Sequence, residues 1–500
     1  MDWRRVILRN ASANVIRGMA TAAVGLVMPP FLTRLLPADK FSAWSLLLQL
    51  ATYASYLDFG LQTAVSRYVA HASERGDYEK RDRIIASAMV LLAGVGGLVL
   101  VATMVMSWQL SNIYPQVPHA LVPDFRAALI VIGCSMALGL PMAVFTGVLV
   151  GLHRNEFPAI AIGGSRIAIA ATIILLARHS DRLLGFAIAM SLWQLAGYAF
   201  QAEASRRLLG RLSTSMRKVT RQTVKELAGY CATLSVWNVG VLLVYGLDLI
   251  LVGYVEFNAL GAYSIANTLV MFVAGLNGAV FSAMISPAAA LHARHEHEQL
   301  GRLVIRSTRL GMYLTALTGL PLIVFGGLIL SHWVKAAYAG PALPILQILT
   351  AANIIRLTAN PYSVAVLGTA QQRLIYISPL VEGLTNLVAS IVLGMRFGAL
   401  GIAAGTLVGS IIGLLWTIFY SVPRTNEVGI TLGEYVFSGV LKGFAVLLPV
   451  LLATALSGVL PKLAGLVTIA AGLLLTSYLI ISRETQLVAS PASPPAVRTQ

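Results

Sequence analysis

The chain has 500 residues, of which 57% are hydrophobic and only 11% are charged, and its mean hydropathy is +0.79. A soluble domain carries about a quarter charged residues, so this composition excludes cytosolic enzymes, disordered chains and secreted disulfide scaffolds. The 36 Lys and Arg residues exceed the 20 Asp and Glu residues by 16 charges. Because the positive charges fall between apolar runs, they indicate inner helix ends and anionic lipid headgroups rather than nucleic acid. Cys134 and Cys231 lie in apolar stretches and are too few for a zinc site, and we expect no metal and no cofactor.

Apolar runs long enough to cross a hydrocarbon core of about 30 Å extend from one end of the chain to the other. They predict an all-α polytopic membrane protein with about fourteen transmembrane helices. The first run contains Arg17 and lacks a small-residue cleavage site, so we expect a retained helix rather than a signal peptide. The predicted spans are 12–34, 41–64, 86–110, 126–150, 158–177, 183–204, 228–253, 259–287, 308–331, 342–368, 374–395, 399–421, 436–457 and 462–482.

The distribution of Lys and Arg predicts the orientation of these spans. If the chain starts inside, about 24 of these residues fall on the cytoplasmic side and about eight on the opposite side. A threefold excess of this kind supports cytoplasmic termini and an even number of spans. The longest loop, a basic connector at 206–227, is too short for a catalytic domain and is expected to lie at the interface as an amphipathic helix. The Pro- and Ser-rich tail at 483–500 is expected to be disordered.

Three short matches at a nearly constant offset indicate an internal duplication of six spans. Because six is even, the two copies have the same topology, which is the parallel kind of transporter repeat. We therefore predict a first lobe at 1–205 with helices 1–6, a second at 228–421 with helices 7–12, and an addition at 422–482 with helices 13–14. Phe41–Leu46 aligns with Leu260–Ile265 at an offset of 219, Leu184–Ala187 with Leu400–Ala403 at 216, and Gly151 with Gly368 at 217.

Several motifs along this pattern resemble one family of membrane transporters. They are the run from Pro29 to Ala70, Gly147–Arg154, Asp248–Tyr254, Ala259–Ala266 and Trp333–Leu349. Their order and spacing resemble the polysaccharide transporter and O-antigen flippase family of the multidrug, oligosaccharidyl-lipid and polysaccharide exporter superfamily. The stretch Pro37–Ser42 departs from the Gly-containing turn more common in that family, which leaves the subfamily and the substrate open.

The resemblance implies a flippase of the bacterial inner membrane. Such a protein moves an undecaprenyl-pyrophosphate-linked oligosaccharide, an O-antigen or exopolysaccharide repeat unit, from the cytoplasmic to the periplasmic leaflet by alternating access. Its partners would be this lipid-linked oligosaccharide, membrane lipids, and polymerase and chain-length components of a polysaccharide assembly pathway. The resemblance implies neither an enzyme nor a nucleic-acid partner.

Three arginines inside predicted spans are the candidate ligands for the pyrophosphate, because ionisable side chains within the membrane are functional hypotheses by default. Arg166 lies roughly 12 Å deep in its span and Arg356 roughly 20 Å from the outer end of its span. Arg17 is shallow enough to reach the inner headgroups instead. For Arg166 and Arg356, a structural ion pair is the competing interpretation.

Three acidic residues within the spans are candidates for ion coupling or for ion pairs: Asp58, Asp248 and Glu382. Glu382 is expected either to pair with Arg356 on the neighbouring span or to titrate during proton or sodium coupling. Asp58 and Asp248 stand near predicted span ends, so a capping or interfacial role competes with coupling. The sequence leaves both interpretations open.

Two other functions remain open at this stage. A membrane polysaccharide polymerase or glycosyltransferase needs an acidic pair at an outer loop, where Asp124 and Asp181 stand alone. A cation-coupled multidrug exporter usually has twelve spans and leaves the last two unexplained. The absence of a GxxxxGK[ST] phosphate loop from the sequence argues against ATP-driven transport by this chain.

Overall fold

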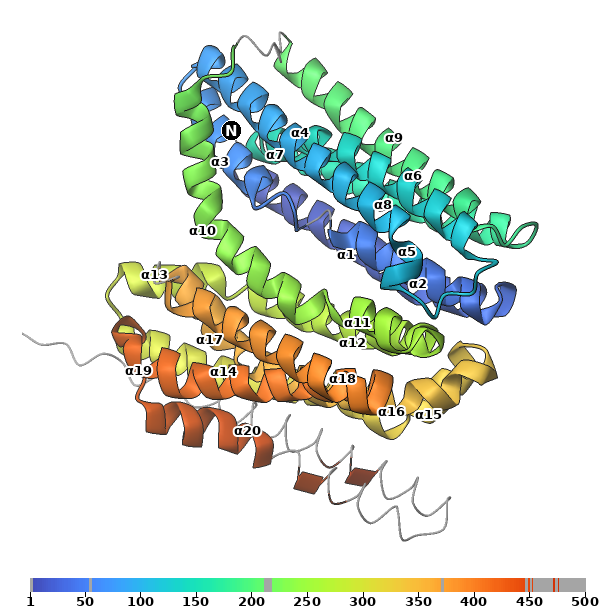
Figure 1. Cartoon of the computed structure of the whole chain (residues 1–500). Coiled ribbons are helices and arrows are strands. Elements are labelled where there is room, and N and C mark those ends of the chain that lie inside the picture. Colours follow the sequence, from blue (N-terminus) through green and yellow to red (C-terminus); the bar gives the residue numbers. More distant parts are fainter. Residues whose placement is uncertain are drawn as a thin grey trace, which may run out of the picture. The chain divides into compact units, whose positions relative to one another are not determined.

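The computed structural model describes residues 3–53, 56–210, 218–369 and 373–445, together with 448–449, 452, 471–472 and 475. Every regular element within these ranges is helical (Figure 1). The chain divides into two compact units. Unit 1 contains 1–272, 328–349 and 376–412, and unit 2 contains 273–327, 350–375 and 413–500. This division does not follow the connector, and the two six-helix lobes stay a prediction.

The first nine helices account for the six spans predicted in the first half of the chain. Two of those spans are each built from two consecutive helices, α2 with α3 and α6 with α7. Helix α5 is a single turn in a loop. The bounds are α1 Trp3–Leu35, α2 Ala38–Tyr53, α3 Leu61–Glu74, α4 Tyr78–Trp108, α5 Leu110–Ile113, α6 Val122–Met142, α7 Val144–Gly151, α8 Glu156–Ala177 and α9 Leu183–Leu209.

The second half begins with helix α10 and consists of shorter segments joined at breaks. Spans 7 to 10 are each made of two consecutive helices, and two stretches after Trp416 are π-helical. The bounds are α10 Arg221–Tyr245, α11 Asp248–Val255, η2 Phe257–Ala259, α12 Leu260–Ser282, α13 Ile285–Ala293, α14 His297–Val324, α15 Gly326–Trp333, α16 Ala336–Thr358, α17 Asn360–Gly368, α18 Arg373–Trp416, η3 Thr417–Ser421, α19 Val422–Arg424, η4 Asn426–Val428, η5 Glu434–Leu441 and α20 Lys442–Ala445.

Within the described ranges, nine helical stretches are long and apolar enough to cross a membrane, and ten if α14 and α15 form one bent span. One of the nine, Ile377–Arg424, has 48 residues, or about 70 Å of helix, more than twice the thickness of a hydrocarbon core. It contains a reversal at Gly398, where φ is 60° and ψ is −141°, so α18 is a hairpin of predicted spans 11 and 12. The all-α membrane fold is confirmed. The total of fourteen stays a prediction, because span 14 and most of span 13 lie outside the described residues.

The basic connector differs from its prediction. The predicted separate amphipathic helix at 206–227 is wrong for the described residues, because α9 continues to Leu209 and α10 begins at Arg221. Residues 211–217 and the tail at 483–500 lie outside the described residues. The side-chain oxygen of Thr220 accepts from the backbone N–H of Thr223, so the start of α10 has an ordinary N-cap.

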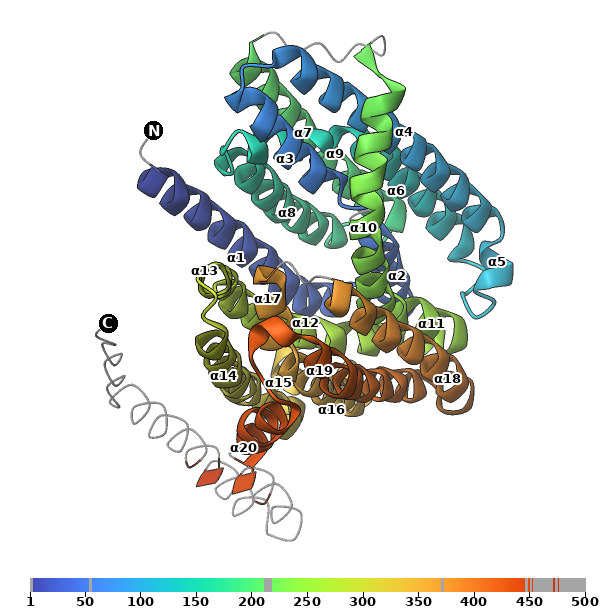
Figure 2. The same cartoon turned by 90° about the vertical axis from the view of Figure 1, so that its left-hand side faces the viewer.

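In unit 1, α6 packs between α4 and α9, and α8 packs against α1 and α9 (Figure 2). The contacts are close because glycines stand at the crossings. A β-carbon on Gly133 of α6 would lie 2.8 Å from the Thr103 Cβ of α4, and one on Gly139 would lie 2.7 Å from the Tyr198 ring of α9. In unit 2, α14 packs against α13, α17 and η5.

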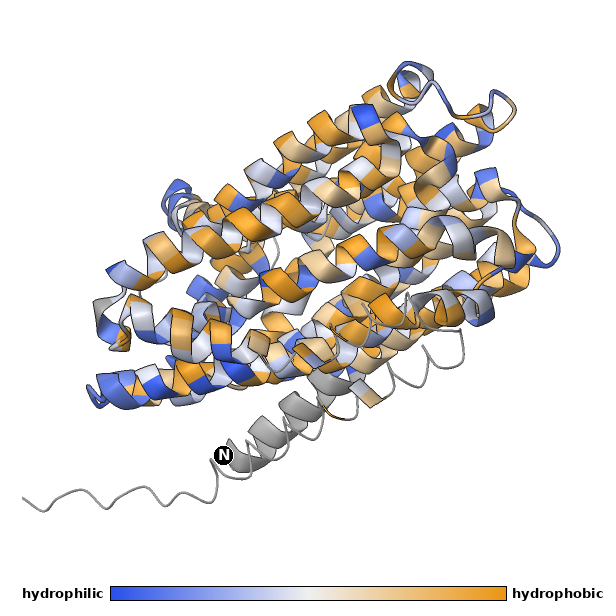
Figure 3. Ribbon diagram, turned by 90° about the horizontal axis from the view of Figure 1, so that it is seen from below, coloured by the Kyte–Doolittle hydropathy of each residue, from blue (hydrophilic) through white to orange (hydrophobic). Residues whose placement is uncertain are grey.

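Hydropathy follows the helices in the manner expected of membrane spans. Apolar residues occupy the middle of the long helices, and polar residues gather at their ends and in the connecting loops (Figure 3). An ion pair joins the first turn of α2 to the loop between α8 and α9, with Lys40 Nζ 2.7 Å from Asp181 Oδ2. The hydrogen bond from Lys40 lowers the pKa of the Asp181 carboxyl, so this small contribution to stability is present at neutral pH and is lost as the pH falls through that pKa.

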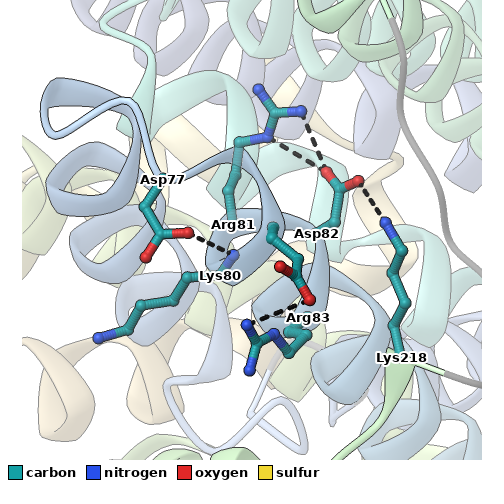
Figure 4. Close-up of polar contacts among 7 residues, drawn as sticks. Asp77, Lys80, Arg81, Asp82, Arg83 and Lys218 are labelled. Atoms are coloured by element: carbon teal, nitrogen blue, oxygen red, sulfur yellow. Dashed lines mark hydrogen bonds and ion pairs between the residues drawn. The ribbon is translucent and has the colours of Figure 1, made fainter.

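A buried ion cluster joins the start of α4 to Lys218 of the basic connector (Figure 4). Arg81 Nη2 lies 3.0 Å from Asp82 Oδ1, and Lys218 Nζ lies 3.0 Å from Asp82 Oδ2. Arg81 is 4% exposed and Asp82 is 6% exposed, so their charges stabilise one another in a site with little water. The ion pair between Asp82 and Lys218 therefore ties the connector to α4.

We expect Asp82→Ala to lower the stability of the folded chain strongly. Removing one partner of a buried pair costs about 3–5 kcal/mol, because the remaining charge loses its compensation. Thermal unfolding in detergent measures the change. The matched control is Glu79→Ala, which removes the exposed pair to Arg83 and is expected to cost well under 1 kcal/mol. Equal melting temperatures for the two variants would contradict this assignment.

Candidate functional site

The seventh predicted span, 228–253, is broken at residues 246–247, and the break frees backbone groups within the span. Helix α10 ends at Tyr245 and α11 begins at Asp248. The freed carbonyl of Gly246 accepts from Gln49 Nε2 at 2.9 Å and from the Tyr53 hydroxyl, so side chains of α2 satisfy it. Asp248 is the first residue of α11, where the helix dipole favours a negative charge.

Neutral polar side chains from three helical segments surround the Asp248 carboxylate. Its Oδ2 accepts from the Tyr263 hydroxyl at 3.0 Å and from Thr406 Oγ1 at 2.8 Å. Its Oδ1 lies 3.4 Å from Asn386 Nδ2. Tyr263, Asn386 and Thr406 are all nearly inaccessible, with 0%, 1% and 4% exposure. These contacts form a buried polar network of oxygen and amide groups around a carboxylate, within the membrane spans.

The α18 hairpin brings two of these residues together. After Gly398 the second arm starts at Ala399, whose backbone N–H donates to Glu256 Oε2 at 2.8 Å. The two arms approach so closely that a β-carbon on Gly405 would collide with Ser390, and one on Gly409 would lie 2.8 Å from the Asn386 Cβ. Glycine at these positions therefore lets Asn386 of the first arm and Thr406 of the second arm face the same carboxylate.

Glu382 belongs to the same arm of α18 and is 8% exposed. Its Oε1 lies 3.4 Å from Ser410 Oγ on the second arm. Glu382 precedes Asn386 by one helical turn, and Ser410 follows Thr406 by one turn. The contact between Glu382 and Ser410 therefore lies one turn away from the contacts that Asn386 and Thr406 make with Asp248. The structure thus brings two of the three predicted acidic residues into one polar region.

Two of the three predicted arginines stand on neighbouring helices. Arg17 of α1 packs beside α8, where a β-carbon on Gly163 would lie 4.0 Å from the Arg17 Cα and 3.6 Å from the Ala20 Cβ. Arg166 lies three residues beyond Gly163 on α8, so it stands one helical turn further along the face of α8 that packs against α1. Arg17 is half-buried and Arg166 is exposed, and both guanidinium groups belong to unit 1.

Asp58 lies in the turn between α2 and α3 rather than within a continuous helix. Its Oδ1 accepts from the Gly60 backbone N–H at 3.0 Å, and Gln62 also donates to it. The Tyr198 hydroxyl of α9 interacts electrostatically with both Asp58 and Arg166, and forms a hydrogen bond with Gln194.

Arg356 lies on α16 in a half-buried position and belongs to unit 2. Glu382 belongs to unit 1, so the expected Glu382–Arg356 pair stays a prediction. Within the described part of the chain, no group of three His, Cys, Asp or Glu side chains is placed to hold a metal ion.

Sequence reasoning missed the neutral members of the site, which are Tyr198, Tyr263, Asn386 and Thr406. One signal was available, because Asn386 follows Glu382 by four residues and therefore shares its helical face. For Tyr263 and Thr406 the sequence holds no comparable signal, since hydroxyl groups are common in membrane helices and usually bond to their own backbone.

Comparison with known proteins decides the family. The family model described as "Polysaccharide biosynthesis protein" matches residues 7–291, more than half of the chain. The chain belongs to this family. The chain is also similar to the "Uncharacterized membrane protein EpsK" of Bacillus subtilis strain 168, with 26% identity over 419 residues. That match covers 80% of the chain and 79% of the Bacillus protein.

Solved structures with the same fold are transporters. The lipid II flippase MurJ in an inward closed conformation matches with a TM-score of 0.70 and 13% identity, over 96% of this chain and 100% of that one. An inward-facing multidrug resistance MATE family transporter of the MOP superfamily matches with a TM-score of 0.64 and 14% identity, over 82% and 98%. At these identities the likeness shows the fold. The resemblance to a polysaccharide family, expected from the sequence, is confirmed by the family model.

Proposed function

We propose that this protein is a flippase that moves an undecaprenyl-pyrophosphate-linked oligosaccharide repeat unit from the cytoplasmic to the periplasmic leaflet. The observation that carries the proposal is the match to the polysaccharide biosynthesis family, joined to a fold shared with a lipid II flippase. Both point to a saccharide carried on a lipid. The repeat unit would be that of an O-antigen or an exopolysaccharide.

The substrate poses a physical problem that the arginines address. A pyrophosphate without a partner costs several kcal/mol or more inside hydrocarbon, because its charge loses hydration. Guanidinium groups match phosphate oxygens in a bidentate geometry. We propose that Arg17 and Arg166, on the adjacent helices α1 and α8, contact the pyrophosphate, and that Arg356 contributes a third contact during the transport cycle.

Alternating access needs an energy source, and the Asp248 network supports coupling to a cation or proton gradient. A carboxylate with two hydroxyl groups beside it offers hard oxygen ligands for one monovalent cation, or a site for one proton. Glu382, one turn away, would share this charge. Asp58, whose carboxylate accepts from the Gly60 backbone N–H, would be a further candidate for ion coupling.

The proposed setting is a bacterial inner membrane with both termini in the cytoplasm. The basic residues at 206–227 then face anionic lipid headgroups. The oligosaccharide delivered to the outer leaflet would pass to polymerase and chain-length components of a polysaccharide assembly pathway.

Two contacts weaken the polymerase alternative. The carboxylate of Asp124 accepts from the backbone N–H groups of Leu183 at 2.7 Å and Leu184 at 3.1 Å, so it caps the start of α9. Asp181 pairs with Lys40. Both outer-loop acids therefore have structural partners. The fold shared with MATE transporters keeps a cation-coupled exporter as the second candidate.

A deletion strain tests the proposal. Undecaprenyl-linked oligosaccharides would be extracted, and their leaflet determined by accessibility to an external glycosidase in spheroplasts. We expect complete repeat units to accumulate on the protected inner side, and the wild-type gene to reverse this. Repeat units that reach the outer face but stay unpolymerised would support a polymerase, and an unchanged lipid pool would support drug export.

A further inference from the structure

Helix α14 carries three arginines on one face near its first turns, which lie on the cytoplasmic side in the proposed orientation. Arg302, Arg306 and Arg309 follow one another at intervals of one helical turn, and we call them the arginine row. The predicted span begins at residue 308, so Arg309 lies at the edge of the hydrocarbon core. Arg306 stands about 3 Å and Arg302 about 9 Å outside that edge. The headgroup layer is about 5–8 Å thick, so the row crosses the depth at which lipid phosphates lie.

The row lies between a packed side and an exposed side of α14. On the packed side, α14 contacts η4, η5 and α20, and a β-carbon on Gly301 would lie 2.8 Å from the carbonyl oxygen of Gly429. On the other side, Leu310 is 43% exposed and Leu317 is 52% exposed. Exposed leucines within a membrane span face lipid chains. Because Leu310 follows Arg306 by one turn, the row borders the lipid.

The two inner arginines of the row lack an acidic partner in the part of the chain that the structure describes. No ion pair or side-chain hydrogen bond joins Arg306 or Arg309 to another described residue, and the Nε atom of Arg309 is shielded from solvent. The nearby acid of η4 is engaged elsewhere, since Glu427 Oε2 lies 3.2 Å from His292 Nε2. Two adjacent positive charges at the edge of the hydrocarbon are therefore left without a counter-charge from these residues.

A lipid phosphate supplies what this arrangement lacks. An unpaired charge at the edge of hydrocarbon is costly, and guanidinium groups bind phosphate oxygens in a bidentate geometry. We propose that the arginine row binds the phosphate of an anionic lipid in the inner leaflet, whose chains then lie along Leu310 and Leu317. The site is separate from the three arginines proposed for the pyrophosphate, because α14 carries none of them. It takes its side of the membrane from the proposed orientation and requires no particular transport substrate.

Quenching by brominated lipids measures binding at this position. In the full chain with Cys134→Ser and Cys231→Ser, Leu310→Cys would carry a bimane fluorophore in place of an exposed side chain. The protein would be reconstituted in phosphatidylcholine vesicles that contain either brominated phosphatidylglycerol or brominated phosphatidylcholine. We expect the anionic lipid to reach half-maximal quenching at a mole fraction at least fivefold lower. The reason is that its phosphate has no ammonium group beside it to compete with the arginines.

The arginine variants assign the preference to the row. Arg306→Gln with Arg309→Gln is expected to abolish it, so that both lipids quench at the same mole fraction. Lysine at both positions keeps the charge but loses the bidentate geometry, so an intermediate preference is expected. The matched control is Arg83→Gln with Arg207→Gln, which removes the same charge from exposed ion pairs on α4 and α9. It should leave the preference unchanged.

A second fluorophore position tests whether any arginine near the interface has the same effect. Val90→Cys on α4 lies at a similar depth, about two turns beyond Arg83, whose guanidinium pairs with Glu79 at 3.3 Å. Because that arginine already has a counter-charge, we expect less than a twofold preference there. Equal quenching by the two lipids at Leu310→Cys would overturn the site. An unchanged preference in the double glutamine variant would overturn it as well.

The bound phosphate can belong to a bilayer phospholipid or to a diphosphate-linked lipid, and competition separates these sources. Unbrominated undecaprenyl diphosphate would be added in an amount equal to the brominated phosphatidylglycerol. Relief of quenching would identify the diphosphate-linked lipid as the preferred ligand, and retained quenching would identify the phospholipid. No transport is measured, so a protein that binds lipid at the row but moves no lipid-linked oligosaccharide would refute the proposed function and keep the site.

Discussion

Charge reversal at both arginines of the first lobe, Arg17→Glu with Arg166→Glu, is expected to abolish translocation of the lipid-linked oligosaccharide. Each guanidinium supplies charge-assisted hydrogen bonds worth about 1.5–3 kcal/mol. At about 1.4 kcal/mol for each power of ten, losing two such contacts lowers the rate at least a hundredfold. The new carboxylates would also repel the pyrophosphate. Leaflet accessibility of undecaprenyl-linked oligosaccharide in the complemented deletion strain measures the effect.

The control variants separate charge from structure. Arg17→Lys with Arg166→Lys keeps both positive charges but loses the bidentate geometry, so an intermediate rate is expected. Arg178→Glu reverses an exposed arginine at the C-terminal end of the same helix α8, and should leave translocation unchanged. Unchanged export in the triple variant that adds Arg356→Glu would contradict the assignment of a pyrophosphate site to these arginines.

The helical architecture could be predicted from the sequence, because long apolar runs carry their own signal. The predicted boundary between spans 11 and 12, at 395–399, contains the reversal at Gly398. Two of the breaks inside spans, at Gly246 and in the turn that holds Asp58, were not predicted. At Gly246 and in the turn that holds Asp58, the residues are apolar enough to continue a span, and the helix ends because neighbouring side chains satisfy the freed backbone groups.

The charged members of the site could also be predicted, but their grouping could not. Arg17, Arg166, Asp248 and Glu382 are conspicuous because charges are rare within membrane spans. Their grouping depends on tertiary contacts between segments far apart in the chain. Such contacts bring together the helices of Arg17 and Arg166, and they place Thr406 beside Asp248. The repeat offset was the exception. It aligned Ser42 with Gly261 in the sequence, and in the fold the backbone N–H of Gly261 donates to Ser42 Oγ.

Neutralising the central carboxylate with Asp248→Asn is expected to uncouple transport from its ion gradient. The substitution keeps the size of the side chain and one oxygen to which Tyr263 and Thr406 still donate, and it gives up the long 3.4 Å contact with Asn386 Nδ2. It removes an attraction for a bound cation or proton worth about 4 kcal/mol at a separation of 4 Å and an effective dielectric constant of 20. Translocation driven by a gradient should therefore fall roughly a hundredfold or more.

The measurement is translocation in proteoliposomes across which a proton or a sodium gradient is imposed in turn. Thr406→Val should reproduce part of the loss, because it removes a hydroxyl that contacts Asp248. The matched control is Thr268→Val on α12, since that hydroxyl bonds to the carbonyl of Ser264 in its own helix at 2.8 Å.

Gradient-dependent transport at the wild-type rate in Asp248→Asn would refute coupling at this carboxylate. A loss confined to one of the two gradients would identify the coupling ion. The Thr406→Val variant adds a second distinction, because a proton binds to the Asp248 carboxylate alone, whereas sodium also needs the Thr406 hydroxyl as a ligand.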